Sequence, residues 1–503
     1  MKAYTVFLLC AATALALPAQ DFTTLHAFDG ADGAQPYANL VQGADGNLYG
    51  TTASGGANPG PFTDGAGTIF KITPTGTLTT IYNFCSQGGN LCTDGYWPFA
   101  GLVQAADGDF YGTTYAGGAP SDFCYGGCGT VFKITPSGTL TTLHSFCSQS
   151  GCSDGASPDS ILVQGTDRDF YGTTQYWGAN GSTGDEAGTV FKITPSGTLT
   201  TLYSFCPRTS TSCTDGSLPG QLIQASNGDF YGTTVDGGAN GGGTIFKITP
   251  NGTLTSLYSF CAQPNCTDGF SPDGLVPTTS GGFYGTTSLG GGGAGGSVFK
   301  LTPGGTLTTV YSFCTTNLGR CGEYPGGLVQ ATNGDFYGFT SQGGANYYYG
   351  TVFKVTPDGA FKTVHNFCSQ GGNPWCADGA FPSGALMQAT NGEIYGTTGN
   401  GGAGTCPSGC GVIFGLSLGL APFVETQPAA GKVGVLIRIL GTDLTGVSSV
   451  TFNGTPAVVG VSSAPGVVTE ITTYVPAGAT TGPVQVVTPS GTLSSNAPFR
   501  VLP

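Results

Sequence analysis

Acidic residues recur at one place in a segment that the chain repeats seven times. Six of them precede a glycine and a glutamate takes the related place in another copy: Asp32, Asp94, Asp154, Asp215, Asp268, Asp378 and Glu323. A ring of carboxylates could bind Ca²⁺, which prefers oxygen ligands. One aspartate per copy is also typical of a structural device, because aspartate caps its own Asp-Gly turn. The second interpretation is favoured, so we expect no cofactor and keep Ca²⁺ as the alternative.

Cleavage of a polysaccharide by a hydrolase or lyase would require a pair of carboxylates at a suitable separation. Loop residues that could supply such a pair are Asp159, Asp185, Glu186, Asp273 and Glu323. The histidines do not form a cluster, because each replaces a tyrosine of the repeat: His26, His144 and His365. The sequence has no Gly-x-Ser-x-Gly elbow, phosphate loop or His-based metal motif. An enzyme is therefore the alternative hypothesis, not the first.

Aromatic residues that break the repeat suggest a binding surface. They lie in loops of variable length, and the candidates are Tyr96, Trp97, Tyr176, Trp177, Tyr348 and Trp375. Aromatic faces on a polar, acidic surface suit stacking against sugar rings. The competing interpretation is that these side chains pack under neighbouring loops. The leading hypothesis is a binding or surface-interaction protein, with a glycan or a surface protein as its partner.

Cysteines fall into local pairs once the N-terminal apolar segment, which contains Cys10, is set aside. The pairs are Cys85/Cys92, Cys124/Cys128, Cys147/Cys152, Cys206/Cys213, Cys261/Cys266, Cys314/Cys321, Cys368/Cys376 and Cys406/Cys410. An even number at short spacings in an exported chain predicts disulfides. Zinc is disfavoured because no Cys-x-x-Cys knuckle occurs and the histidines are scattered.

The elements that must position these residues are short strands. Each copy has a Leu-Val-Gln-like run, then Tyr-Gly-Thr-Thr or a close relative, then a run like Gly-Thr-Val-Phe-Lys-Ile-Thr-Pro. In all copies but the last, a fourth strand such as 140–146 follows. Asp-Gly or Asn-Gly between the first two runs predicts a type I′ hairpin. Four antiparallel strands at periods of 53 to 62 residues are typical of a propeller blade.

The count of strands predicts how the ring closes. The last copy ends at its third strand, 411–414, whereas a fourth-type strand, 22–28, stands alone at the N-terminus. The N-terminal strand should therefore complete the last blade and leave no open edge. We expect an all-β protein: a seven-bladed β-propeller closed by the N-terminal strand, at residues 21–418. The loops between strands two and three, and between blades, vary in length and carry the cysteines, so their face is the candidate binding surface. The alternative, of equal weight, is that glycine-rich loops simply tolerate insertions.

The repeated phrases, such as 107–114 and 129–132, resemble the GloVer tandem-repeat family of bacterial exported proteins over residues 22–418. The resemblance implies a surface or secreted protein and no general catalytic role for the repeat. This chain departs from its own pattern at Pro277, at Arg168 in place of the turn glycine, and at Gly415 in place of lysine.

The repeat stops near Ala421, and a different pattern of strands follows. Alternation at 435–439, a strand and turn at 450–454, and the segments 474–486 and 488–491 resemble the IPT/TIG branch of immunoglobulin-like sandwiches. The resemblance covers residues 422–503 and implies a spacer or interaction domain, so we expect a C-terminal Ig-like β-sandwich there.

Composition limits the location and partners. Residues 1–20 have Lys2, an apolar run and Pro18-Ala19-Gln20, which indicate a secretory signal peptide. No later segment is apolar enough to span a membrane. The net charge of −14 opposes a phosphate backbone, so nucleic acid is not an expected partner. We expect a secreted or cell-surface bacterial protein with a monomeric propeller.

Overall fold

The computed structural model describes residues 21–61, 64–88, 92–180, 187–206, 213–278, 281–315, 321–346, 348–370, 376–402, 404–460 and 469–502. The chain is all-β, and these residues contain no α-helix, only two short 3₁₀ turns, η1 (Ser150–Cys152) and η2 (Pro264–Cys266). The predicted signal peptide, residues 1–20, lies outside the described residues, as do Asp185, Glu186 and Trp375. No helix among the described residues is long and apolar enough to cross a membrane.

Between residues 21 and 417, the described residues form seven four-stranded antiparallel sheets. The first three are β2 (Val41–Gln42), β3 (Leu48–Thr52), β4 (Thr68–Ile72), β5 (Leu78–Asn83); β6 (Val103–Gln104), β7 (Phe110–Thr114), β8 (Thr130–Ile134), β9 (Leu140–Ser145); and β10 (Val163–Gln164), β11 (Phe170–Thr174), β12 (Thr189–Ile193), β13 (Leu199–Ser204). The next three are β14 (Ser217–Gln224), β15 (Phe230–Asp236), β16 (Thr244–Ile248), β17 (Leu254–Ser259); β18 (Phe270–Pro277), β19 (Phe283–Leu289), β20 (Ser297–Leu301), β21 (Leu307–Ser312); and β22 (Gly322–Gln330), β23 (Phe336–Gly343), β24 (Thr351–Val355), β25 (Phe361–Asn366).

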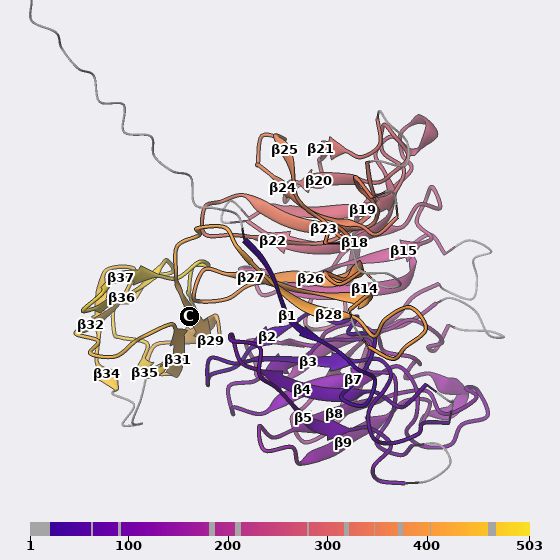
Figure 1. Cartoon of the computed structure of the whole chain (residues 1–503), viewed down its shortest axis with the longest axis horizontal. Helices are drawn as coiled ribbons and strands as arrows, with labels where there is room; N and C mark the ends of the chain where they lie inside the picture. Colours follow the sequence, from indigo (N-terminus) through magenta and orange to yellow (C-terminus); the bar gives the residue numbers. More distant parts are fainter. Residues whose placement is uncertain are drawn as a thin grey trace, which may run out of the picture.

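The seventh sheet joins the two ends of the repeat region. It contains β26 (Ala380–Gln388), β27 (Ile394–Asn400) and β28 (Val412–Ser417), and its outer strand is β1 (Asp21–Ala27). Figure 1 shows β1 beside β28, and their register pairs Asp21 with Ser417 and Ala27 with Val412. The predicted pairing of the N-terminal strand with the last repeat is therefore present.

Successive sheets pack through an aromatic pair at five junctions. There the tyrosine of the second strand contacts the phenylalanine that begins the second strand of the next sheet, with ring centroids 4.2 Å apart for Tyr49 and Phe110 and 4.0 Å for Tyr111 and Phe170. At the other two junctions Ile394 and Leu48 stand in place of the phenylalanine. Both partners are buried, so the repeated residues form a core between sheets. The last sheet also contacts the first, because the Thr397 hydroxyl donates to the Ala38 carbonyl at 3.2 Å.

The hairpin between the first and second strands differs from the predicted type I′ turn. Gly46 has φ +79°, but Asp45 is not in the left-handed region, and Gly46 N–H donates to Gly43 O at 2.9 Å. This is a type I turn followed by one left-handed residue. The prediction was wrong because an Asp-Gly pair suits both turns, and only glycine takes the positive φ here. Arg168 adopts the same conformation, with φ +72°.

The C-terminal module, residues 424–502, has two four-stranded sheets and a parallel pair. The first sheet contains β29 (Val424–Gln427), β31 (Leu436–Gly441), β35 (Glu470–Tyr474) and β34 (Val459–Gly460); the second contains β33 (Thr455–Ala457), β32 (Ser449–Phe452), β36 (Val484–Thr488) and β37 (Gly491–Ser494). The parallel pair is β30 (Ala430–Lys432) with β38 (Arg500–Leu502). Val424, Ile439, Phe452, Val486 and Phe499 belong to its own buried core.

This module contacts the hairpin turns of several repeat sheets (Figure 1). Thr469 Oγ1 donates to Ala44 O at 2.9 Å, and Asn496 Nδ2 donates to Gln330 O at 3.2 Å. Arg500 Nη1 donates to Ala225 O at 3.4 Å. These turns belong to the first, sixth and fourth sheets, so the module extends across the hairpin face. The opposite face, which bears the disulfide loops, has no such cover among the described residues.

Candidate functional site

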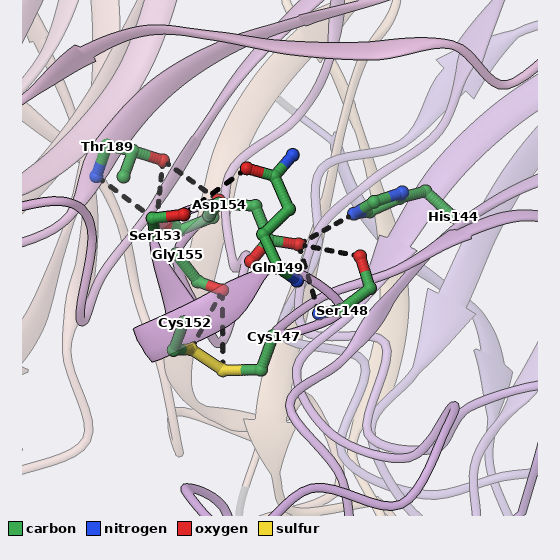
Figure 2. A network of polar contacts seen from close by, with 10 residues as sticks. His144, Cys147, Ser148, Gln149, Cys152, Ser153, Asp154, Gly155 and Thr189 are labelled. Carbon is green, nitrogen blue, oxygen red and sulfur yellow. Dashed lines mark hydrogen bonds and ion pairs between the residues drawn. A yellow bond between two sulfur atoms is a disulfide. The ribbon is translucent and has the colours of Figure 1, made fainter.

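The aspartates of the Asp-Gly turns are used by their own loops. Asp154 is buried, and its Oδ2 lies 3.0 Å from His144 Nε2 and accepts from the Ser148 backbone N–H and hydroxyl at 3.2 and 3.0 Å (Figure 2). Gln149 N–H donates to Oδ1 at 3.4 Å. This carboxylate organises the loop closed by the disulfide Cys147–Cys152.

Other repeats use the same pairing of a fourth-strand side chain with the turn aspartate. The pairs are His26–Asp32 at 2.7 Å, Tyr82–Asp94, Tyr203–Asp215 and Tyr258–Asp268 at 2.8 Å, and His365–Asp378 at 3.1 Å. Histidine and tyrosine are interchangeable here because either ring can donate to the carboxylate. These aspartates therefore act as turn caps, and the histidines belong to separate loops.

The structure contains eight disulfides, each between two cysteines four to eight residues apart. They join Cys85–Cys92, Cys124–Cys128, Cys147–Cys152, Cys206–Cys213, Cys261–Cys266, Cys314–Cys321, Cys368–Cys376 and Cys406–Cys410, the same pairs as the spacing predicts. Sulfur atoms of Cys124, Cys128 and Cys147 lie close enough together to surround a metal, but all three are oxidised. A disulfide has no thiolate to offer a metal.

The predicted aromatic residues do not gather into one exposed surface. Tyr96 is 1% exposed, which leaves no ring face for a ligand. Trp97 is half-buried and packs against Tyr96 and Phe99, with centroids 5.0 and 6.2 Å away. Tyr348, in contrast, is 67% exposed. For Tyr96 and Trp97 the structure agrees with the alternative of packing between loops.

Trp177 and Tyr176 lie between the second and third repeats. Trp177 contacts Phe123 edge-on at 5.0 Å, and both Trp177 and Tyr176 pack on the buried cluster around Cys152. The backbone of Trp177 has φ +63°, and glycine such as Gly117 occupies the equivalent position in the other repeats. A non-glycine residue in the left-handed region costs on the order of 1–2 kcal/mol.

A second set of residues lies at the centre of the ring. In every repeat a buried proline lies within the first strand or a few residues before it, and from the third to the seventh sheet the first strands of neighbouring sheets contact one another. The residue after that proline therefore lies near the central axis, at the end of the strand that faces the disulfide loops. We call these seven positions the inner ring: Tyr37, Phe99, Asp159, Gly220, Asp273, Gly326 and Ser383.

The inner ring is strongly asymmetric. Tyr37 and Phe99 are neighbours, with ring centroids 6.2 Å apart, and Phe99 also contacts Tyr115 at 5.3 Å. Asp159 precedes β10 of the third sheet, Asp273 lies in β18 of the fifth, and Gly220 of the fourth takes the same position between them. The inner ring therefore has two neighbouring aromatic rings, followed by Asp159 in the next repeat and Asp273 two repeats further on.

The pKa of Asp159 differs from the ordinary value of an aspartate. Burial, with the charge of Asp273 as a smaller cause, raises the pKa of Asp159 to about 7. Burial also raises the pKa of Asp273. Asp273 has many protein atoms around it, yet its side chain is exposed to solvent, so this effect of burial is discounted. Gln175 Nε2 donates to Asp159 Oδ2, whereas no described side chain donates to Asp273.

A pocket of about 370 Å³ opens beside Asp273. Its lining combines hydroxyl, amide and aromatic groups: Asp273, Ser288, Tyr324, Pro325, Gly326, Phe339, Ser341 and Gln342. Tyr324 is 39% exposed, so part of its ring is free to contact a bound molecule. Asp159 and Asp273 are among the loop acids predicted from the sequence, whereas Tyr37, Phe99, Gln175 and Tyr324 are not. Alignment of the seven copies on the proline would have revealed Tyr37 and Phe99, because the residue after the proline differs from copy to copy.

Comparison with known proteins identifies the family of the repeats. The family model described as the Gloeobacter/Verrucomicrobia repeat matches residues 11–214 and 207–375. The chain belongs to this family. The GloVer resemblance is therefore confirmed, while the immunoglobulin-like resemblance of the C-terminal module is not tested by it. No curated protein matches the chain.

Solved structures similar to this Gloeobacter/Verrucomicrobia repeat protein are β-propeller-like. A fungal alcohol oxidase of the AA5 family in complex with copper has a TM-score of 0.51 and 13% identity, covering 96% of this chain and 99% of that chain. A putative gluconolactonase has a TM-score of 0.37 and 12% identity, covering 80% and 94%. A PQQ-bound aldose sugar dehydrogenase from Streptomyces coelicolor has a TM-score of 0.38 and 14% identity, covering 63% and 92%. At 13% identity the likeness to the alcohol oxidase concerns the fold alone.

Proposed function

We propose that this protein is a secreted or cell-surface carbohydrate-binding protein built on a seven-bladed β-propeller, residues 21–418, with an Ig-like module of the IPT/TIG type, residues 422–503. The binding site is the inner ring with its adjoining pocket, on the disulfide-bearing face. Eight disulfides and the predicted signal peptide at residues 1–20 support export. The C-terminal module contacts the other face, and this favours access from the disulfide side.

The asymmetry of the inner ring carries the proposal. A propeller needs no particular side chain after the proline, since tyrosine, phenylalanine, aspartate, glycine and serine all occur there. Sugars are recognised by an aromatic face that covers C–H groups and by polar side chains that bind hydroxyls. Tyr37 and Phe99 supply the first, and Asp159, Gln175 and the pocket beside Tyr324 supply the second.

Charge narrows the ligand class. The chain has a net charge of −14, and the inner ring contains two carboxyl groups but no basic residue. A uronic or sulfated sugar would meet like charge in this site. The ligand is therefore expected to be a neutral oligosaccharide.

A glycan array with neutral and acidic oligosaccharides tests the proposal, followed by calorimetric titration of the best neutral glycan. We expect Phe99→Ala and Tyr324→Ala to weaken binding about tenfold or more with little change in melting temperature. Tyr348→Ala is the control, because this exposed tyrosine lies outside the inner ring and pocket. Absence of glycan binding would contradict the function. Binding that depends on Tyr348 and not on Phe99 or Tyr324 would place the site in the outer loops.

A further inference from the structure

One position of the repeat holds phenylalanine in the sixth sheet and threonine in the other six. It is the first threonine of the Tyr-Gly-Thr-Thr run, and Phe339 stands in its place in β23. The threonine hydroxyl can bridge neighbouring sheets: Thr51 donates to Ala100 O at 2.9 Å, and Thr286 donates to Gly326 O at 3.1 Å. Phenylalanine has no hydroxyl, so the sixth sheet lacks this hydrogen bond to the seventh.

The glycine that faces this position does not require a phenylalanine. The tip of the Phe339 ring lies on Gly326, where it would overlap an added Cβ atom. The fourth sheet has a glycine at the same inner-ring position, Gly220, and there the facing residue is Thr233, whose Oγ1 would lie 3.2 Å from an added Cβ. Glycine in the inner ring is therefore compatible with threonine opposite it. Phe339 is a feature of the sixth sheet for which the repeat gives no packing reason.

Phe339 lines the pocket of about 370 Å³ whose other residues come from the fifth and sixth sheets. These sheets lie side by side, since β22 contacts both β18 and β19 (Figure 1). Phe339 is 7% exposed, and Tyr324, which is 39% exposed, supplies a second ring to the same pocket. Polar side chains complete the lining: Asp273, Ser288, Ser341 and Gln342. Such a lining suits a sugar, because its C–H groups pack on aromatic rings and its hydroxyl groups bind polar side chains.

We propose that this pocket is a sugar subsite of its own, in which one neutral pyranose ring packs on Phe339 and Tyr324. This inference rests on the proposed carbohydrate site and adds a specificity-determining residue, because threonine in place of Phe339 offers no planar face. The exposed Asp273 has no described side-chain donor, so its carboxyl oxygens are open to sugar hydroxyls. The volume is near the lower end of the range for small-molecule pockets, about 300–1,000 Å³, and fits one or two sugar rings. Phe99, in the second sheet, is a separate contact for a longer chain.

The test restores the residue of the other repeats in the full-length protein. Phe339→Thr should fold like the parent, since six sheets contain this threonine and one of them pairs it with a glycine. The probes are the methyl pyranosides of glucose, galactose, mannose and N-acetylglucosamine, measured by saturation-transfer NMR, which detects sugar protons close to aromatic rings. We expect at least one of them to give a signal with the parent and with Phe99→Ala. The signal should be lost with Phe339→Thr.

Calorimetric titration of the neutral glycan retained on the array measures the size of the effect. Phe339→Thr should weaken its binding about tenfold, as expected for the loss of one stacked aromatic ring. Phe339→Leu keeps most of the apolar volume but has no planar face, so it should weaken binding by a similar factor while the core stays filled. Tyr348→Ala, outside the pocket, should bind like the parent.

The outcomes separate failure of the subsite from failure of the proposed function. Glycan binding that depends on Phe99, with both Phe339 variants as tight as the parent, would overturn the subsite and leave the carbohydrate site at the inner ring intact. Absence of binding of every probe to the parent would overturn the proposed function and the subsite with it. If Phe339→Thr lowers the melting temperature strongly, the titration of Phe339→Leu decides: affinity equal to that of the parent would refute the role of the Phe339 ring.

Discussion

Asp159→Asn should change how the stability of the protein depends on pH. Burial and, secondarily, the charge of Asp273 raise the pKa of Asp159 from 3.8 to about 7. Between these values the folded protein keeps a proton that the unfolded chain has lost, so the free energy of unfolding falls as pH rises. At about 1.36 kcal/mol for each pH unit, the upper bound of that loss is about 4 kcal/mol. Solvent near the carboxyl group screens its charge, and we expect about 2 kcal/mol.

Urea unfolding of the parent and the Asp159→Asn variant at intervals from pH 4 to pH 8 measures this loss. The parent should lose stability across the interval relative to the variant, because asparagine does not titrate. Asp122→Asn controls for removal of one negative charge at an exposed site. Parallel curves for the parent and Asp159→Asn would refute the assigned environment of Asp159. The experiment needs no ligand, so it tests the geometry independently of any carbohydrate.

Three further predictions concern the framework. Deletion of residues 21–29 should lower the melting temperature strongly, because it removes β1 and exposes the edge of β28; an unchanged melting temperature would contradict ring closure by this strand. Asp154→Ala should cost about 2–3 kcal/mol in urea unfolding, since it leaves His144 and the Ser148 N–H without their acceptor, and a cost below about 0.5 kcal/mol would refute the capping role. Replacement of both Cys147 and Cys152 by serine should lower the free energy of unfolding by about 2 kcal/mol in the same assay, as expected for a disulfide that closes a short loop. An unchanged free energy of unfolding would show that this disulfide does not stabilise the protein.

The repeat made much of the framework predictable. Each strand is formed by adjacent residues, so its pattern can be recognised locally. Where the pattern of one copy is ambiguous between strand and loop, the other six copies support the assignment. Counting strand types was sufficient to place 22–28 beside the last repeat, and β1 pairs with β28 there. The turn type was not predictable from Asp45-Gly46, because the dipeptide is compatible with two turns that require a different φ of the aspartate.

The candidate site was less predictable because proximity across the ring has no local signature. Asp159 and Asp273 are separated by 114 residues, and only the closed ring of sheets brings their charges together. Tryptophans drew attention because they are rare in this sequence, yet Trp97 packs within its own loop. Rarity identifies a residue that breaks the repeat, but not the direction in which its side chain lies.

Positions that stay the same in the repeat and positions that change therefore have different physical explanations. Tyr111 and its equivalents are kept because each fills the space between two sheets, where a smaller residue would leave a cavity. The position after the proline fills no such space, so glycine at Gly220 and tyrosine at Tyr37 are both compatible with the fold. Packing does not explain why Tyr37 and Phe99 stand at two of these positions and Asp159 and Asp273 at two others. Removing the Asp159 carboxyl group from water costs stability once it ionises, and a bound ligand is the physical reason that would offset that cost.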